Sequence, residues 1–541
     1  MIRPISFSIL ILLLFSGIAS GLFAQDATPV VRKYLVLFKD KDLERWSPHR
    51  PWEFLSARAL ERRARYGLPI EFSDIPVDET ALRTLSEAGA TIHNTTKWLN
   101  GAQIICSESL LPSLASLPFV ESIHYVGGHK DRKRAKPASS LKSGDQEMYE
   151  NAYGLGALQI SMTNGHVLHQ LGFRGESVWV QVQDGGFSSV HLMSVFDSLR
   201  GEGRLFEGYD FIESDREVFE SSSHGSQVLS VMAANRPGVM IGTAPDATYV
   251  LSKTEDTKGE SHVEELNWIA AAEYADSLGV DVINSSLGYT TFNDTSLNWT
   301  YADMDGRTTW ATRGAEMAFA KGMMVVNSAG NEGTSEWRYI GSPADGPNVL
   351  AVGAVGWDGE RAPFSSGGPS ADGRIKPNVA APGNVVVVAS TEADELTLSA
   401  GTSFAAPLVA GLVTTLWQAF PERSNAEIME ALELTASQAD NPDTILGYGI
   451  PDMLAAFQFL NDRYVILTDR SPDAITQFRR PVVILPADTF EEGGVIYLHG
   501  STGNILDKVT TPAPSGSKGL HISLDPRLAS PPYFIRILPH Q

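Results

Sequence analysis

The most informative stretch of this chain is Ser399–Gly411, which reads SAGTSFAAPLVAG. Small residues surround Ser403, which stands where a long apolar helix is predicted to begin. We expect Pro407 to fall in the first turn of this helix, where its missing N–H costs little. Ser403 would then be exposed at the positive end of the helix dipole, near unpaired backbone N–H groups that can hold an oxyanion. An N-capping serine is the alternative, but the small neighbours favour a nucleophile.

Three further motifs offer what a nucleophilic serine needs: a base, a group that orients the base, and an oxyanion donor. Asp184 closes an apolar-alternating strand and is followed at once by two glycines. His224 opens an apolar-periodic helix, in which Gly225 allows another backbone to come close. Asn331 follows an apolar strand, and its amide can donate to an oxyanion. Taken singly, these are also a turn signal, a capping or packed histidine and a polar turn.

Strand and helix patterns alternate between residues 153 and 460, which predicts a parallel sheet sandwiched by helices in an α/β domain. Reactive groups in such a domain gather outside the carboxyl ends of the strands. The expected strands are 178–182, 248–252, 280–284 and 323–326, and the expected helices are the one after His224, 263–278 and 312–321.

The chain on either side has a different character. Residues 31–126 predict a ferredoxin-like α+β domain interrupted by a helical insertion at 52–66. Its other expected elements are strands 33–38, 91–97, 101–107 and 120–125 and helices 79–88 and 109–116. After residue 463, strands at 482–485, 495–498, 520–524 and 533–538 predict a small β-sandwich.

A basic stretch separates the first two domains, at Lys130, Arg132, Lys133, Arg134 and Lys136. It is typical of a solvated linker and also of a cleavage site. At the N-terminus, residues 1–24 have the pattern of a signal peptide. Their apolar run is shorter than the roughly 20 residues that cross a bilayer.

Composition narrows the function classes. Hydrophobic residues make up 43% and charged residues 20%, which is typical of a soluble globular protein. The formal net charge of −22 disfavours nucleic acid as a partner and suits solubility or the attraction of basic peptides. The single cysteine, Cys106, excludes an intramolecular disulfide and is expected to be a small buried hydrophobe.

Taken together, the four motifs resemble those of the subtilisin-like serine proteases over residues 153–460. Their order matches the family's acid, histidine, oxyanion asparagine and serine with Asp184, His224, Asn331 and Ser403. The resemblance further implies two segments that line a substrate cleft, Ser286-Leu287-Gly288 and Ala329-Gly330, the first pairing with the peptide as an added strand. The alternative for the first segment is an ordinary strand end.

The wider arrangement looks like the exported subtilases of Bacteroidetes-type bacteria, through the leader, Trp98-Leu99-Asn100 and Thr254-Glu255-Asp256. This implies an inhibitory, folding-assisting propeptide at 25–127, a linker with the maturation site at 128–152, a catalytic domain at 153–460 and a C-terminal domain at 461–541. Residues 496–503 resemble the central turn of a type IX secretion sorting domain, although the usual basic tail does not follow.

The sequence therefore predicts a secreted or cell-surface serine endopeptidase that acts on proteins and peptides, is inhibited by its own propeptide and needs no cofactor for catalysis. A structural calcium ion stays open, with no metal ligand set assigned. Two alternatives are a peptide-binding scaffold without activity and a serine esterase, although Gly-x-Ser-x-Gly is absent around Ser403. Five acids, Glu255, Asp256, Glu260, Glu264 and Glu265, favour either basic substrates or, better, a solvated helix start.

Overall fold

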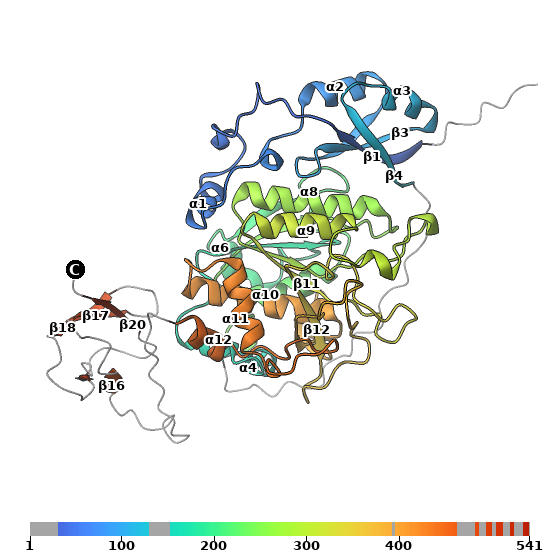
Figure 1. Cartoon of the computed structure of the whole chain (residues 1–541). Helices are drawn as coiled ribbons and strands as arrows, with labels where there is room; N and C mark the ends of the chain where they lie inside the picture. Colours follow the sequence, from blue (N-terminus) through green and yellow to red (C-terminus); the bar gives the residue numbers. More distant parts are fainter. Residues whose placement is uncertain are drawn as a thin grey trace, which may run out of the picture.

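The computed structural model describes residues 31–128, 152–391 and 395–461, together with five strands between residues 482 and 539 (Figure 1). The predicted signal peptide and almost all of the predicted linker lie outside the described residues. Among the helices that are described, none combines the length and the apolar character needed to cross a bilayer.

The N-terminal domain is a four-stranded antiparallel sheet with strand order β2-β3-β1-β4. The predicted β-α-β-β-α-β order is confirmed, with the helix at 109–116 starting as a 3₁₀ turn. Cys106 is buried in the core of this domain, as expected. The elements are β1 (Val31–Phe38), α2 (Glu79–Glu87), β2 (Thr91–Thr96), β3 (Gly101–Ser107), η3 (Glu108–Leu110), α3 (Leu111–Ala115) and β4 (Val120–Gly127).

The helical insertion between β1 and α2 leaves this sheet. It contains η1 (Pro51–Glu53), α1 (Ala57–Arg65) and η2 (Phe72–Asp74). The hydroxyl of Ser56 caps α1 by accepting from the backbone N–H of Ala59. In Figure 1, α1 lies apart from β1, β3 and β4 and beside one end of α8 (His262–Leu278).

The central domain is built on seven parallel strands in the order β13-β12-β11-β10-β5-β9-β6. Its middle strands are buried on both faces, in keeping with the apolar residues that begin β10 and β11 and run through β12. The strands are β5 (Trp179–Asp184), β6 (Leu205–Asp210), β9 (Thr248–Lys253), β10 (Val282–Ser285), β11 (Met324–Ser328), β12 (Val349–Val355) and β13 (Val379–Pro382).

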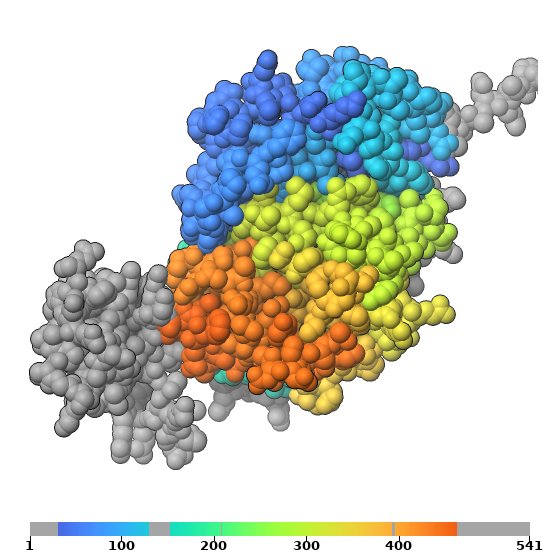
Figure 2. All heavy atoms as spheres, viewed as in Figure 1, coloured from blue at the N-terminus to red at the C-terminus, as the bar shows by residue number. Residues whose placement is uncertain are grey.

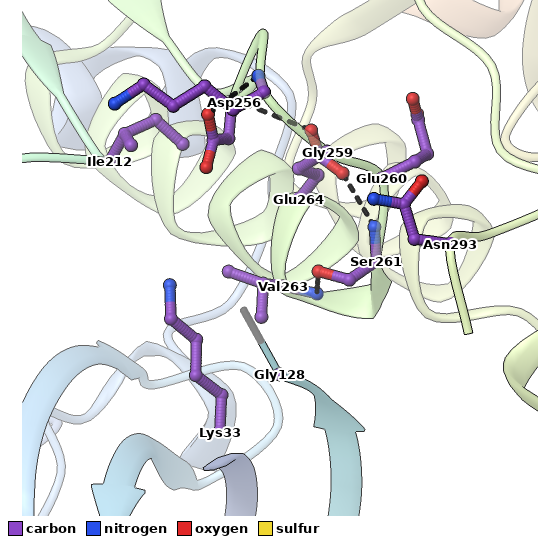
Figure 3. A pocket seen from close by; sticks show the side chains of 11 residues that line it. Lys33, Gly128, Ile212, Asp256, Gly259, Glu260, Ser261, Val263, Glu264 and Asn293 are labelled. Atoms are coloured by element: carbon purple, nitrogen blue, oxygen red, sulfur yellow. Dashed lines mark hydrogen bonds between the residues drawn. The ribbon is translucent and has the colours of Figure 1, made fainter. Parts of the chain in front are cut away.

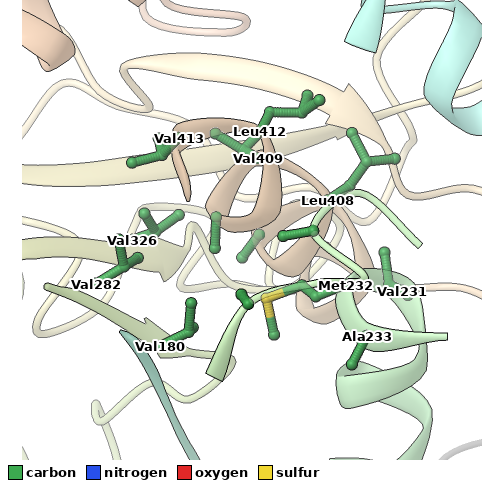
Figure 4. Packing of buried hydrophobic residues seen from close by; sticks show 14 of the residues in the cluster. Val180, Val231, Met232, Ala233, Val282, Val326, Leu408, Val409, Leu412 and Val413 are labelled. Atoms are coloured by element: carbon green, nitrogen blue, oxygen red, sulfur yellow. The ribbon is translucent and has the colours of Figure 1, made fainter. Parts of the chain in front are cut away.

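Helices cover both faces of this sheet, as predicted. Alternate residues of one strand belong to different cores: Val282 packs with α7 (His224–Ala233) and α10 (Thr402–Ala419), and Ile283 packs with α8 and α9 (Trp310–Ala320). Figure 4 shows the first core, where α10 and α7 meet the sheet at Val180, Val282 and Val326. The remaining elements are α4 (Ala157–Ser161), α5 (Gly165–Gln170), α6 (Asp197–Gly201), α11 (Asn425–Leu434), α12 (Met453–Leu460), β7 (Asn235–Arg236), β8 (Met240–Ile241), β14 (Val386–Ala389) and β15 (Leu396–Ser399).

The N-terminal domain lies on the layer formed by α8 and α9 (Figures 1 and 2). Leu35, Trp98 and Val126 belong to the same apolar core as α8 and α9, so this core spans both domains. Beside it, the carboxylate of the buried Glu273 on α8 accepts hydrogen bonds from the Thr96 hydroxyl at 2.5 Å, the Lys97 N–H at 2.8 Å and the Trp98 N–H at 3.0 Å. Residues 96–98, at the end of β2, therefore take part in the contact between the two domains.

Towards the C-terminus, β16 pairs with β19, and β17 pairs with β18 and β20, all antiparallel. Four of these strands match predicted ones, whereas β18 was not predicted. The segments needed to judge the predicted β-sandwich lie outside the described residues. The strand bounds are β16 (Val482–Leu485), β17 (Gly494–His499), β18 (Ile505–Thr511), β19 (Leu520–Ser523) and β20 (Phe534–Pro539).

Candidate active site

Asp184 and His224 form a hydrogen-bonded pair at the carboxyl edge of the sheet. Asp184 is the last residue of β5, and His224 is the first residue of α7. The Nδ1 of His224 lies 2.8 Å from the Oδ2 of Asp184, whose other oxygen accepts from the N–H of Gly185 at 2.7 Å. A carboxylate can only accept, so Nδ1 carries the proton of the neutral ring and Nε2 is the acceptor. The pair thus has the geometry of a general base with its orienting acid.

A close contact between backbones sets this pair. A Cβ atom at Gly225 would lie 2.4 Å from the carbonyl oxygen of Gly186, so only glycine fits there. The predicted close approach at Gly225 is confirmed. Gly186 itself has a φ of 136°, in the region that favours glycine. Gly186 and Gly225 therefore allow the start of α7 to approach the end of β5 closely.

Ser403 is the second residue of α10, close to the same edge. The residue before the helix is Gly401, which makes no side-chain cap, so the N-cap alternative for Ser403 is wrong. The expectation of an exposed serine is also wrong, since Ser403 is 8% exposed. The next residue, Phe404, has its ring centroid 5.6 Å from that of His224, which brings the start of α10 beside the imidazole.

Pro407 is the sixth residue of α10, not part of its first turn as predicted. At this position its missing N–H would have bonded to the carbonyl of Ser403. The Ser286 hydroxyl donates to that carbonyl instead, at 2.8 Å. The Oγ of Ser403 in turn lies 3.4 Å from the carbonyl oxygen of Ser286. Because Ser286 follows β10 directly, the start of α10 is tied to the end of a central strand.

Asn331 lies on the other side of the α10 start. Its Oδ1 accepts from the N–H of Thr402 at 2.9 Å and from the Thr402 hydroxyl at 3.0 Å. A backbone N–H can only donate, so the amide orientation is fixed and the NH₂ group is the other end of the side chain. The side chain is exposed, and its NH₂ group is a donor available to a ligand at the surface. Thr402, which the sequence reasoning did not single out, is the link between Asn331 and Ser403.

The predicted cleft residues also lie at this edge. Ser286, Leu287 and Gly288 follow β10, and the Leu287 carbonyl is held by the Asn327 side chain at 3.0 Å. A Cβ atom at the exposed Gly288 would meet no protein atom nearer than 3.9 Å, so the space beside it is open to a ligand.

Ala329 and Gly330 follow β11 on the neighbouring strand end. The side chain of Ala329 is buried in a small apolar cluster, so only its backbone can face a substrate. Gly330 is half-buried, and its N–H donates to the Thr402 hydroxyl at 3.2 Å. This segment is therefore hydrogen-bonded to the start of α10.

The acidic residues at the start of α8 have a structural use. Asp256, Glu260 and Glu264 line a hollow between the two domains, opposite Lys33 (Figure 3). Glu264 completes a capping box and accepts from the N–H groups of Ser261 and Asp256. The prediction of a helix start is thus confirmed. The prediction that these acids are solvated is wrong for Glu264, which is 1% exposed. Glu265 is likewise buried and accepts from the Trp299 indole at 3.0 Å.

These acids do not make a complete calcium site in the described part of the chain. Glu255, Glu260 and Glu264 bring one carboxylate oxygen each within 4.8 Å of one another. Calcium takes six to eight oxygens, and Glu255 already accepts from the Tyr289 hydroxyl at 2.7 Å. Lys33 also faces the hollow (Figure 3). We therefore assign no metal here.

Comparison with known proteins identifies the family of this chain. The sequence profile of the Subtilase family (Peptidase S8) matches residues 175–449, and that of the Peptidase S8 propeptide domain of Bacteroidota matches residues 33–142. Subtilisin E of Bacillus subtilis (strain 168) is 31% identical over 379 residues, which cover 69% of this chain and 85% of that protein. Subtilisin of Bacillus pumilus is 33% identical over 304 residues, covering 55% of this chain and 98% of that protein. The chain therefore belongs to the subtilase family, as a subtilisin-like serine endopeptidase with a Bacteroidota-type propeptide domain.

Proposed function

We propose that Asp184, His224 and Ser403 are the catalytic triad of this endopeptidase. His224 Nε2 takes the proton of the Ser403 hydroxyl as its oxygen attacks the scissile carbonyl, and then gives that proton to the leaving amine. Water then attacks the acyl-enzyme by the same route and regenerates Ser403. Asp184 holds the ring in the right tautomer and stabilises the imidazolium. The hydrogen bond of 2.8 Å between Asp184 and His224 is the observation that carries this proposal.

The negative oxygen of the tetrahedral intermediate would be held by the Asn331 NH₂ group and by the backbone N–H of Ser403. That N–H belongs to the first turn of α10, where backbone donors have no partner within the helix. The substrate backbone would run between Ser286-Leu287-Gly288 and Ala329-Gly330. The open space beside Gly288 supports this course. Besides the water that releases the acyl-enzyme, the reaction uses only side chains and backbone of this chain, without a catalytic cofactor.

Replacing Asn331 with alanine is expected to lower kcat by about a hundred- to a thousandfold, with KM little changed. The lost donor acts on charge that exists only in the transition state, and subtilisin, a relative of this chain, is the source of that magnitude. Single-turnover acylation of a peptide ester measures the loss. Asn441→Ala, at another exposed asparagine, is the matched control. A turnover close to that of the parent would remove Asn331 from the oxyanion site.

We further propose the division of the chain that the sequence predicts. Residues 1–24 direct export, 25–127 are an inhibitory propeptide, 128–152 contain the maturation cut, 153–460 are the mature catalytic domain, and 461–541 are a candidate sorting domain for type IX secretion. The substrates are extracellular proteins and peptides. The contact of the N-terminal domain with α8 and α9 supports an inhibitory and folding-assisting role. Mass spectrometry of the secreted product tests each boundary.

Acid is expected to weaken the contact between the propeptide and the catalytic domain through His93 on β2. Burial, aided by the nearby Lys33, lowers the pKa of His93 to about 4, although the Phe211 carbonyl and Asp210 act in the opposite direction. A free histidine has a pKa of about 6.5, so the separated form binds the proton better. The contact is therefore at full strength above pH 6.5 and loses about 3 kcal/mol as the pH falls to about 4.

Hydrogen exchange of the β2 amides in a Ser403→Ala background, followed from pH 7 to pH 4.5, measures this loss. His93→Phe is the control, because phenylalanine keeps an aromatic ring but does not titrate. The variant should lose most of the acid sensitivity. An unchanged pH slope in the variant would assign the effect to other groups.

A further inference from the structure

The insertion between β1 and α2 makes a contact that is separate from the sheet of the propeptide. We define the clamp as residues 56–74, which contain α1 and η2. The clamp lies against the C-terminal end of α8, whereas the end of β4 lies at the N-terminal end of the same helix, where Gly127 packs on Ser261. α8 has 17 residues, so the two contacts are about 25 Å apart at 1.5 Å per residue.

The clamp hydrogen-bonds the backbone at the end of α8. The last carbonyls of any helix lack partners within it. Here the N–H and the hydroxyl of Ser56 donate to the carbonyls of Ser277 and Leu278, each at 2.9 Å. Arg58 donates to the carbonyl of Gly279 at 2.9 Å. The final turn of α8 is thus completed by a segment some 220 residues earlier in the chain.

Two buried arginines of the clamp meet one buried aspartate of α8. Arg62 lies 2.5 Å from Asp276, and Arg63 lies 3.0 Å from Asp276 and 2.9 Å from Asp74. The exposed fractions are 2% for Arg62, 3% for Arg63 and 0% for Asp276. Burial alone would raise the pKa of Asp276, but Lys97, Arg62 and Arg63 outweigh it and lower that pKa. Asp276 is thus a buried carboxylate whose partners come from the propeptide.

Three further contacts extend the clamp around the catalytic domain. The Tyr66 hydroxyl donates to the carbonyl of Pro421 at 3.0 Å. The buried Lys321, at the C-cap of α9, binds Asp74 at 3.1 Å and the Ser73 hydroxyl at 2.7 Å. The backbones also come close, since a Cβ atom at Gly279 would lie 2.6 Å from the N of Ala59. The clamp therefore contacts the catalytic domain at the ends of α8 and α9 and just after α10.

We propose that the C-terminal end of α8 is a second anchoring site for the propeptide, which recognises the arginine-bearing helix α1 and retains the propeptide after the chain between the domains is cut. The inference rests on the proposed function, because it presumes that such a cut takes place. Once one of the two contacts with α8 is made, the other forms within the same complex and therefore at a high effective concentration. The two contacts together bind the propeptide far more tightly than either would alone. The clamp is expected to set the time for which the cleaved propeptide stays bound, without contributing to the chemistry.

The test separates retention from catalysis. The full chain carries Ser403→Ala and, within residues 129–151, an inserted site for an added protease of unrelated specificity. After cutting, gel filtration follows the departure of the N-terminal fragment. The parent fragment should stay bound, whereas Arg62→Ala with Arg63→Ala should release it at least a hundredfold faster. Arg83→Ala, at an exposed arginine on α2 outside the clamp, is the matched control and should behave as the parent.

Near-UV circular dichroism before cutting shows whether the double variant is folded. If it is not, Arg58→Ala decides, because Arg58 is partly exposed and its loss leaves Asp276 paired; about tenfold faster release is expected. Release of the fragment at the parent rate in the folded double variant would overturn the second anchor. If the double variant does not fold, release at the parent rate in Arg58→Ala would overturn it. A failure of the proposed function looks different: the chain with Ser403 intact would digest no peptide, whatever the release rates.

Discussion

Ser403→Ala is expected to lower peptide hydrolysis by about a millionfold, the size found on removing the nucleophile in subtilisin, a relative of this chain. Methyl in place of hydroxyl removes the attacking atom but leaves α10 in place, because the Ser286 contact is made to the backbone carbonyl of residue 403. If the proposed maturation cut is made by the protease itself, the purified variant should also keep its full length, whereas the parent should be shortened. Hydrolysis of a peptide library and the mass of the purified chain measure both effects.

The control for this variant is Ser335→Ala, at an exposed serine of the same domain. A fluorophosphonate probe should label the parent and this control, but not Ser403→Ala. Labelling of Ser403→Ala would place the nucleophile elsewhere. Labelling of the parent without any amide hydrolysis would favour an esterase.

Asp184→Asn is expected to lower kcat by about ten-thousandfold with the fold intact, as the equivalent change does in the serine protease trypsin. The amide can place its NH₂ group against His224 Nδ1, which would move the ring proton to Nε2. The imidazole would then have no lone pair towards the serine. The buried position of Asp184 excludes bulk water as a substitute partner.

Steady-state kinetics and the unfolding temperature test this second prediction together. Asp197→Asn, at an exposed aspartate on α6, is the matched control and should keep full activity. A fall in kcat of less than tenfold in a folded Asp184→Asn would contradict the orienting role. A collapse of the fold would instead show that Asp184 is mainly structural.

The sequence was sufficient to predict where two of the candidate site residues lie in the fold. Asp184 and His224 each stand at a change between an apolar run and small residues, so their positions at a strand end and a helix start were predictable. The position of Pro407 was not, because the first residue of α10, Thr402, is held by Asn331, which lies 71 residues earlier in the chain. β18 was missed because Asp507 and Lys508 interrupt its apolar pattern.

Contacts between distant segments could not be predicted from the sequence. Nothing near Arg62 or Arg63 indicates that both reach Asp276, more than 200 residues later. The burial of Glu264 and Glu265 was hidden for the same reason, since charged residues at a helix start are usually solvated. Their partners, such as the Trp299 indole, come from a loop that the local pattern does not reveal.

The core that Leu35, Trp98 and Val126 share with α8 has a consequence for the life of the enzyme. If the first domain is discarded, the remaining body no longer contains everything with which it folded. We expect such a body to refold poorly once it has opened, so that its survival depends on the height of the barrier to opening. The half-life of the mature protease in a harsh medium would then be set by the rate at which it opens.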